Sequence, residues 1–167
     1  MIETLRLGKK YNSDIEQFIY NKNNLYITKD GKRHKIKTLK DFKYLLKECS
    51  FAIRKYTGTS TTGLLLVWKS NYQGVKRNYI KFECDSLHDI DDLLMSLNWS
   101  FPREVYIKLD KGSPAIQSFR KKGFRFCTER GNEVLLFRDK NDRRFIPPTK
   151  GDEDIEEASD DRFNNHN

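Results

Sequence analysis

Positively charged side chains are concentrated in one stretch, KDGKRHKIKTLKDFK. Seven of its fifteen residues are basic, namely Lys29, Lys32, Arg33, Lys35, Lys37, Lys40 and Lys43. Lys and Arg neutralise phosphates without reading sequence, and aromatic rings can stack on bases. Tyr26 and Tyr44 lie beside the stretch. It is therefore a candidate nucleic-acid or anion-binding surface, with a merely solvated lysine-rich surface as the alternative.

A second basic cluster lies in the segment SPAIQSFRKKGFRF, residues 113–126. It comprises Arg120, Lys121, Lys122 and Arg125. The segment is typical of a short helix that starts at Ser113 and Pro114 and ends at Gly123, followed by a strand. The two clusters would form one anion-binding surface if the fold brings them together.

The acidic stretch DSLHDIDD, residues 85–92, carries four aspartates and neither glycine, lysine nor arginine. Ser86 with Asp89 forms a capping box, so ordinary helix capping explains these residues. Just before it, Tyr79, Lys81 and Glu83 alternate with apolar residues and share one face of a predicted strand. Cys84 falls on the apolar face, which favours a core cysteine over a nucleophile. The scattered histidines and three cysteines show no metal-ligand spacing, so we expect no metal site.

The spacing of apolar residues predicts the elements that carry these groups. Helices are expected over residues 13–19, 39–49, 87–97 and 114–122, and strands over 2–7, 51–57, 63–70, 76–84, 103–109, 124–127 and 133–139. Residues 25–37 predict a hairpin that turns at Asp30 and Gly31, and Thr38 with Asp41 a capping box. TGTSTT, residues 57–62, is expected to be a polar loop.

Length and composition bound the class of protein. A chain of 167 residues, 13% aromatic and 34% charged, favours one globular domain with a core. It contains no apolar run of the roughly 18 residues that a membrane span needs, and its first residues have no apolar signal core. We therefore expect a cytoplasmic protein. The domain is expected over residues 1–140, with a linker over 141–150.

Charge divides the chain unevenly. Residues 151–167 have seven acids and one Arg, whereas residues 1–150 have a net charge of +14. The acidic segment is expected to be a disordered tail. A basic body favours an anionic partner, although solubility alone could also explain the charge. The Lys- and Asn-rich composition and small size fit a phage or other viral protein, which would place it in the host cytoplasm or the virion.

The order of elements, together with residues 113–126, resembles the GNAT superfamily of N-acetyltransferases over residues 1–139. That family often carries Asn-x-x-Ala-φ-x-x-Tyr-x-x-x-Gly-Phe, where φ is apolar, after its fifth strand. Ala115, Ile116, Gly123 and Phe124 match that motif at the right spacing. The resemblance implies an α+β fold, an α/β sandwich with a mixed, mostly antiparallel central sheet and about four flanking helices.

The resemblance also implies functional positions, and several differ here. Phe119 stands where the family has a Tyr that commonly protonates the leaving thiolate of coenzyme A, and Gly112 stands at the place of the Asn. Residues 85–92 occupy the place of the glycine-containing loop that holds the coenzyme A pyrophosphate. Glu83 lies where many family members have a general base.

These positions predict a GNAT-like protein with a degenerate active site. We expect it to bind no cofactor and to act through nucleic acid or a protein partner in a larger assembly. One alternative is an acyl-CoA-dependent N-acetyltransferase with an atypical acetyl-CoA site and Glu83 as its base. Another is a structural component recruited for its shape. The sequence leaves the partner and the oligomeric state open.

Overall fold

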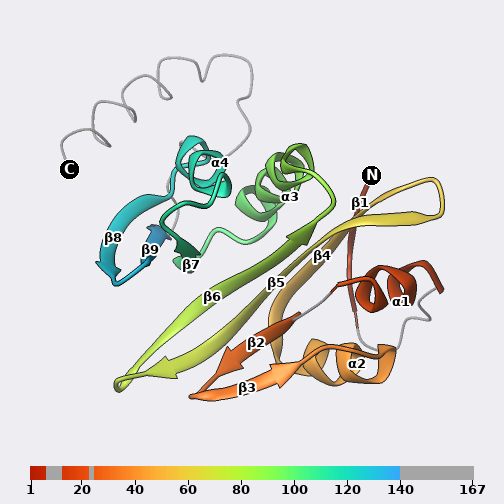
Figure 1. Ribbon diagram of the computed structural model, residues 1–167, viewed down its shortest axis with the longest axis horizontal. Coiled ribbons are helices and arrows are strands. Elements are labelled where there is room, and N and C mark those ends of the chain that lie inside the picture. Colours follow the sequence, from red (N-terminus) through yellow and green to blue (C-terminus); the bar gives the residue numbers. More distant parts are fainter. Residues whose placement is uncertain (7–12, 23–24, 140–167) are drawn as a thin grey trace.

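A seven-stranded sheet forms the centre of the computed structural model, which describes residues 1–6, 13–22 and 25–139 (Figure 1). The strands follow the order β1-β4-β5-β6-β7-β9-β8, and every neighbouring pair is antiparallel except β6 with β7. The mixed, mostly antiparallel sheet and its four helices confirm the predicted fold class. The predicted linker and acidic tail lie outside the described residues.

The sheet strands are β1 (Ile2–Thr4), β4 (Cys49–Thr57), β5 (Ser60–Tyr72), β6 (Val75–Cys84), β7 (Val105–Asp110), β8 (Arg125–Arg130) and β9 (Glu133–Arg138). A separate hairpin pairs β2 (Tyr26–Lys29) with β3 (Lys32–Lys35). The helices are α1 (Ser13–Tyr20), α2 (Leu39–Glu48), α3 (Leu87–Ser100) and α4 (Ala115–Lys121). None of these helices is long and apolar enough to cross a bilayer.

The two faces of the sheet carry different elements. Alternating side chains of the strands divide between two buried clusters, as the period of two requires. The helices α3 and α4 cover one face, which we call the α3–α4 face. The helices α1 and α2 and the β2–β3 hairpin cover the other, the hairpin face.

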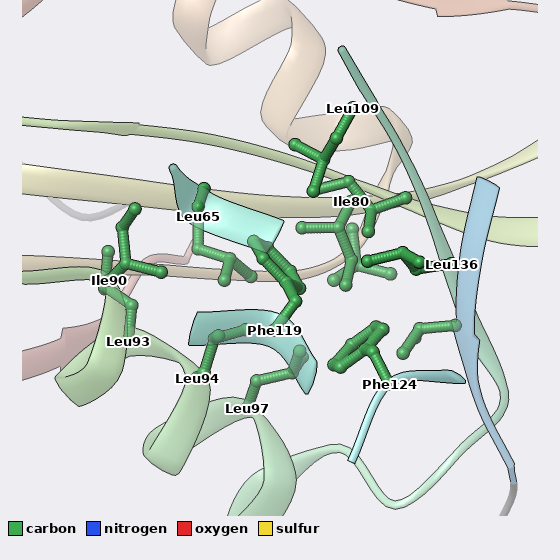
Figure 2. Close-up of a cluster of buried hydrophobic side chains, with 14 of the residues drawn as sticks. Leu65, Ile80, Ile90, Leu93, Leu94, Leu97, Leu109, Phe119, Phe124 and Leu136 are labelled. Carbon is green, nitrogen blue, oxygen red and sulfur yellow. The ribbon is translucent and has the colours of Figure 1, made fainter. Parts of the chain in front are cut away.

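Phe119 lies in the middle of the cluster on the α3–α4 face, among the leucines of α3 and the apolar residues of the sheet (Figure 2). It is completely buried. Its ring lies 5.4 Å from that of Phe82 and 5.0 Å from that of Phe124, the latter in an edge-to-face arrangement. This packing fixes α4 against β6 and α3.

Local sequence signals for caps and turns agree with the structure. The Asp41 amide donates to Thr38 Oγ1 at 3.1 Å, while Asp41 Oδ2 accepts from the Thr38 amide at 3.2 Å. Asp30 and Gly31 both have positive φ, 50° and 82°, as a two-residue hairpin turn with mirror-image geometry requires. Gly123, with a φ of 95°, ends α4.

The prediction of a polar loop over residues 57–62 is wrong, because β5 already begins at Ser60. Thr61 is buried, and its hydroxyl donates to Asp14 of α1 at 3.0 Å and accepts from Arg54 at 2.9 Å. Arg54 also pairs with Asp14 and, at 3.0 Å, with Glu3 of β1. Thr61 therefore belongs to a buried network that ties α1 and β1 to β4 and β5.

Candidate functional site

The strands β6 and β7 separate soon after they meet. Tyr79 and Tyr106 form their one registered pair, with ring centroids 6.1 Å apart. Because the two strands are parallel, both continue toward the same edge of the sheet. There α3 follows β6 and α4 follows β7, as Figure 1 shows. A split in the sheet therefore opens at the carboxyl ends of β6 and β7.

The backbone of β6 presents hydrogen-bonding groups to this split. The amide of Asp85 donates to Thr62 O at 2.9 Å, and the β5–β6 register continues without a bulge. Bonded residues alternate along an antiparallel strand, so Phe82 and Cys84 direct their N–H and C=O groups away from β5. No strand of the described residues pairs with them on that side. These groups could bind an extended ligand.

A cleft of about 840 Å³ occupies the split and continues along the hairpin face. At its hairpin end it is lined by tyrosines and cations, including Tyr26, Arg33, Tyr72, Tyr79, Lys81 and Lys108. At the other end it is lined by acids and the first residues of α3, including Glu83, Asp85, Ser86, Asp110 and Glu133. The hairpin end of the cleft is therefore positively charged, and the other end is negatively charged.

Glu83, the predicted base, lines this cleft and is partly buried. It shares the hairpin face with Tyr79 and Lys81, as the alternation of β6 predicted. Asp110 occupies the corresponding position on β7, four residues beyond the Tyr79–Tyr106 pair. Two carboxylates thus flank the acidic end, where they could receive an amine.

The N-terminus of α3 already holds an anion of its own. Asp89 Oδ2 accepts from the amide of Ser86 at 3.3 Å and from its hydroxyl at 3.1 Å. Lys55 of β4 binds Asp89 at 2.9 Å and also pairs with Asp92. Burial alone raises the pKa of Asp89, but the hydrogen bonds from Lys55 and Ser86 outweigh it and hold the pKa below its usual value. The Asp89 carboxylate thus occupies the place that favours an anion on a helix.

A phosphate group fits poorly at this helix end. Asp85 pairs with Lys22 at 3.0 Å. Residues 85–92 thus carry four carboxylates, and among the described residues two lysines, Lys22 and Lys55, form ion pairs with them. Every residue of the stretch also carries a Cβ atom, which limits close approach of the backbone. These carboxylates and side chains oppose the close approach of a pyrophosphate such as that of coenzyme A.

The two basic clusters predicted from the sequence lie on opposite faces of the sheet. The run from Lys29 to Lys43 spans the hairpin and α2, whereas Arg120 and Lys121 lie in α4 and Lys122 directly follows it. They therefore do not join into one surface. Within the run, Lys32, Lys35, Lys37, Lys40 and Lys43 are exposed, as are Arg120 and Lys121. Lys29 pairs with Glu48.

Arg125 differs from the prediction of an exposed cation. Its side chain is buried, pairs with Asp139 and stacks 5.0 Å from the centre of the Phe137 ring. A guanidinium held in this way stabilises β8 against β9. It is not available to an outside anion.

Burial dominates the surroundings of two of the three thiols. Burial raises the pKa of Cys84 to about 12 and that of Cys49 to about 12. Cys84 packs against the cluster on the α3–α4 face. No group of three or more His, Cys, Asp or Glu residues in the described part of the chain could hold a metal ion.

Sequence reasoning missed Lys108 and did not count Lys81 among the anion-binding residues. Both lie on strands whose alternation is visible in the sequence. Their proximity is not visible, because it depends on the register between β6 and β7, which α3 separates along the chain.

Comparison with known proteins supports the fold. No protein-family model matches the chain, and no curated protein sequence matches it. An N-acetyltransferase of Staphylococcus aureus superimposes with a TM-score of 0.52 at 14% identity, covering 83% of this chain and 97% of the other. A GNAT-family acetyltransferase of Streptococcus pneumoniae gives 0.51 at 10% identity, over 75% and 91%.

A Bacillus subtilis acetyltransferase, solved in complex with CoA, superimposes with a TM-score of 0.50 at 13% identity, over 83% of this chain and 97% of the other. At such identities the likeness concerns the fold. The chain therefore has a GNAT-like fold, and the suspected resemblance is confirmed at that level.

Proposed function

We propose that this protein acts by binding nucleic acid or another protein, and that its GNAT-like fold has lost the standard acetyl-CoA site. The observation that carries the proposal is the carboxylate of Asp89 at the N-terminus of α3. Two unit charges of the same sign 4 Å apart repel by about 4 kcal/mol in a partly buried setting, equivalent to roughly a thousandfold in affinity. A pyrophosphate here would meet this repulsion, reduced by the positive charge of Lys55, and would compete with Asp89 for the amide of Ser86.

The residue at the family's acid position supports the same proposal. Phe119 is completely buried in an apolar cluster and does not line the cleft. It has neither a proton to donate nor a path to a leaving group. Gly112 provides no side chain, although no atom within 4 Å would block one there.

Isothermal titration with acetyl-CoA tests this proposal. We expect no binding at concentrations up to about 1 mM. Micromolar affinity would overturn the proposal and favour the second candidate. This titration reports on the cofactor alone, so it is independent of any nucleic-acid measurement.

The second candidate is an acyl-CoA-dependent N-acetyltransferase. The unpaired backbone groups of Phe82 and Cys84 favour it, because they could hold the pantetheine arm of acetyl-CoA. Glu83 would then take the proton from the acceptor amine. If acetyl-CoA binds, Glu83→Gln should abolish acetyl transfer to an amine and leave acetyl-CoA binding within about twofold.

The type of partner is a separate question. Exposed cations of the hairpin and α2 favour nucleic acid, whose binding should weaken steeply with salt. Two exposed apolar residues one turn apart on α3, Met95 and Trp99, favour a protein partner. If DNA and RNA both fail to bind at low salt, we expect co-purification with a protein. A cytoplasmic or virion location and a phage origin remain part of this proposal.

A further inference from the structure

Two lysines face each other across the split between β6 and β7. Tyr79 pairs with Tyr106 in the parallel register, so the next residues on the same face are Lys81 and Lys108. Both line the cleft. Two ammonium groups that line one cleft repel each other, so their placement favours a compensating interaction.

That compensation does not come from carboxylates. Within residues 1–6, 13–22 and 25–139, no acid forms an ion pair with Lys81, Lys108 or Arg33. Tyrosine rings contact the cations instead. The Lys81 ammonium lies 5.0 Å from the centre of the Tyr26 ring, and the Arg33 guanidinium lies 4.1 Å from it.

Lys108 is held in the same manner from the other side of the split. Its ammonium lies 4.7 Å from the centre of the Tyr72 ring and 5.7 Å from that of Tyr79. Aromatic faces attract a cation but accept none of its N–H bonds in the way an anion does. All three cations are thus positioned while their donors stay available to a ligand.

The β2–β3 hairpin, which carries Tyr26 and Arg33, is fixed to β5 by hydrogen bonds. The Trp68 indole donates to Thr28 O at 3.0 Å, and the Asp30 amide donates to Ser70 Oγ at 2.9 Å. Asp30 Oδ1 accepts from the amide of Asn71 at 2.6 Å. Because the hairpin is anchored at several points, a ligand would lose little affinity to ordering it.

We infer that the hairpin end of the cleft binds a phosphate group, carried by a mononucleotide or by a single nucleic-acid strand. Lys81, Lys108 and Arg33 supply the positive charge, and the guanidinium of Arg33 can form paired hydrogen bonds to phosphate oxygens. The whole cleft, acidic end included, has a volume of about 840 Å³, within the range of small-ligand sites. This inference rests on the proposed binding function and names its ligand and surface.

The test compares two double variants of the full chain that lose the same charge. Lys81→Gln with Lys108→Gln changes the cleft. Lys69→Gln with Lys76→Gln is the matched control, because both residues are exposed on neighbouring strands and point to the α3–α4 face. Labelled dT12 is followed by fluorescence anisotropy and thymidine monophosphate by calorimetry, both at about 50 mM salt.

We expect the cleft variant to lose at least tenfold in affinity for whichever probe the wild type binds, and the control to lose about twofold or less. The slope of log K against log salt for dT12 should fall by about 1.4 in the cleft variant, since two phosphate contacts are lost. Preference for dT12 over the mononucleotide by tenfold or more identifies a strand as the ligand. Comparable affinity identifies a mononucleotide.

Two results overturn the inference. One is an equal loss in the control variant, which would mean diffuse charge rather than a site. The other is a wild type that binds neither probe at about 20 mM salt. The second result would leave a protein partner for the proposed function, whereas micromolar acetyl-CoA binding would overturn that function instead.

Folding is checked separately. The cleft variant loses both the repulsion between two like charges and their contacts with tyrosine rings, so its melting temperature should stay close to that of the wild type, as circular dichroism would show. The variant with Lys81→Arg and Lys108→Arg keeps both charges and should bind within about threefold of the wild type. Loss of binding in this variant despite an unchanged melting temperature would also contradict the inference.

Discussion

At the residue scale, Phe119 and Glu83 show how differently two positions of one fold can be surrounded. Phe119 is enclosed by apolar residues of α3 and of the sheet and by Phe124, as Figure 2 shows. Glu83 lines an open cleft. A hydroxyl at position 119 would need a buried hydrogen-bond partner, and apolar neighbours offer none. The residue type at position 119 therefore follows from its packing.

Cysteine reactivity can be predicted residue by residue. Cys127 is exposed, whereas burial raises the pKa of both Cys49 and Cys84 to about 12. At about pH 8 only a thiolate reacts with a disulfide reagent, so we expect one fast thiol of three. A colorimetric thiol assay on the native protein measures this, and Cys127→Ser should remove the fast phase. Fast modification of Cys84 would instead indicate an activated nucleophile.

At the element scale, the first residues of α3 both cap the helix and bear on whether a pyrophosphate can bind there. The capping interaction of Ser86 with Asp89 is a local signal that the sequence predicts and the structure contains. Lys55 comes from β4, far along the chain, and turns the cap into an ion pair. The N-terminus of α3, which would receive a pyrophosphate in the second candidate, thus already carries a carboxylate whose charge Lys55 neutralises.

The ion pair makes part of the stability pH-dependent. The folded pKa of Asp89 lies below its ordinary value of 3.8, so its contribution is complete above that value and is lost as the pH falls through the folded pKa. We expect Asp89→Asn to lower the free energy of unfolding by about 1–2 kcal/mol near neutral pH. The difference from wild type should narrow at lower pH.

Urea unfolding at a series of pH values between neutrality and about pH 3 measures this difference. Asp91→Asn, on the same helix and in no ion pair among the described residues, is the control and should cost about 0.5 kcal/mol or less. A difference that stays constant with pH would contradict the role given to the Asp89 charge.

Most elements could be predicted because their signals are local. Thr38 with Asp41, Asp30 with Gly31, and Gly123 each satisfy backbone groups within a few residues. The segment around Thr61 could not be predicted in this way. Its polar composition is typical of a loop, but Thr61 is buried, and its hydroxyl bonds to Arg54 and to Asp14, which lies 47 residues away.

At the scale of the whole molecule, the sheet separates the charge into distinct surfaces. The hairpin and α2 carry one basic group on one face, and α4 carries another on the opposite face. The cleft that occupies the split between β6 and β7 opens on the hairpin face. A polyanion on the hairpin face would therefore reach Lys81 and Lys108 but not α4.

Net charge gives a prediction at this scale. A chain that ends at residue 150 changes from a formal charge of +8 to +14. Attraction to a polyanion grows with charge, so we expect it to bind dT12 at least threefold more tightly than the full chain at about 50 mM salt. The gain should shrink near 200 mM salt, because the charges are then screened. Equal affinities at both salt concentrations would show that residues 151–167 do not compete with the nucleic acid.

The sequence by itself determined the helix caps, the hairpin turn, the alternation along β6 and β7 and the uneven distribution of charge. These features depend on residues a few positions apart, whose geometry the backbone fixes. Only the tertiary structure decided that Arg125 is buried, that the two basic clusters lie apart, and that Lys81 faces Lys108. These relations depend on how α3 and α4 pack on the sheet and set the register of β7 beside β6, which no short stretch of residues encodes.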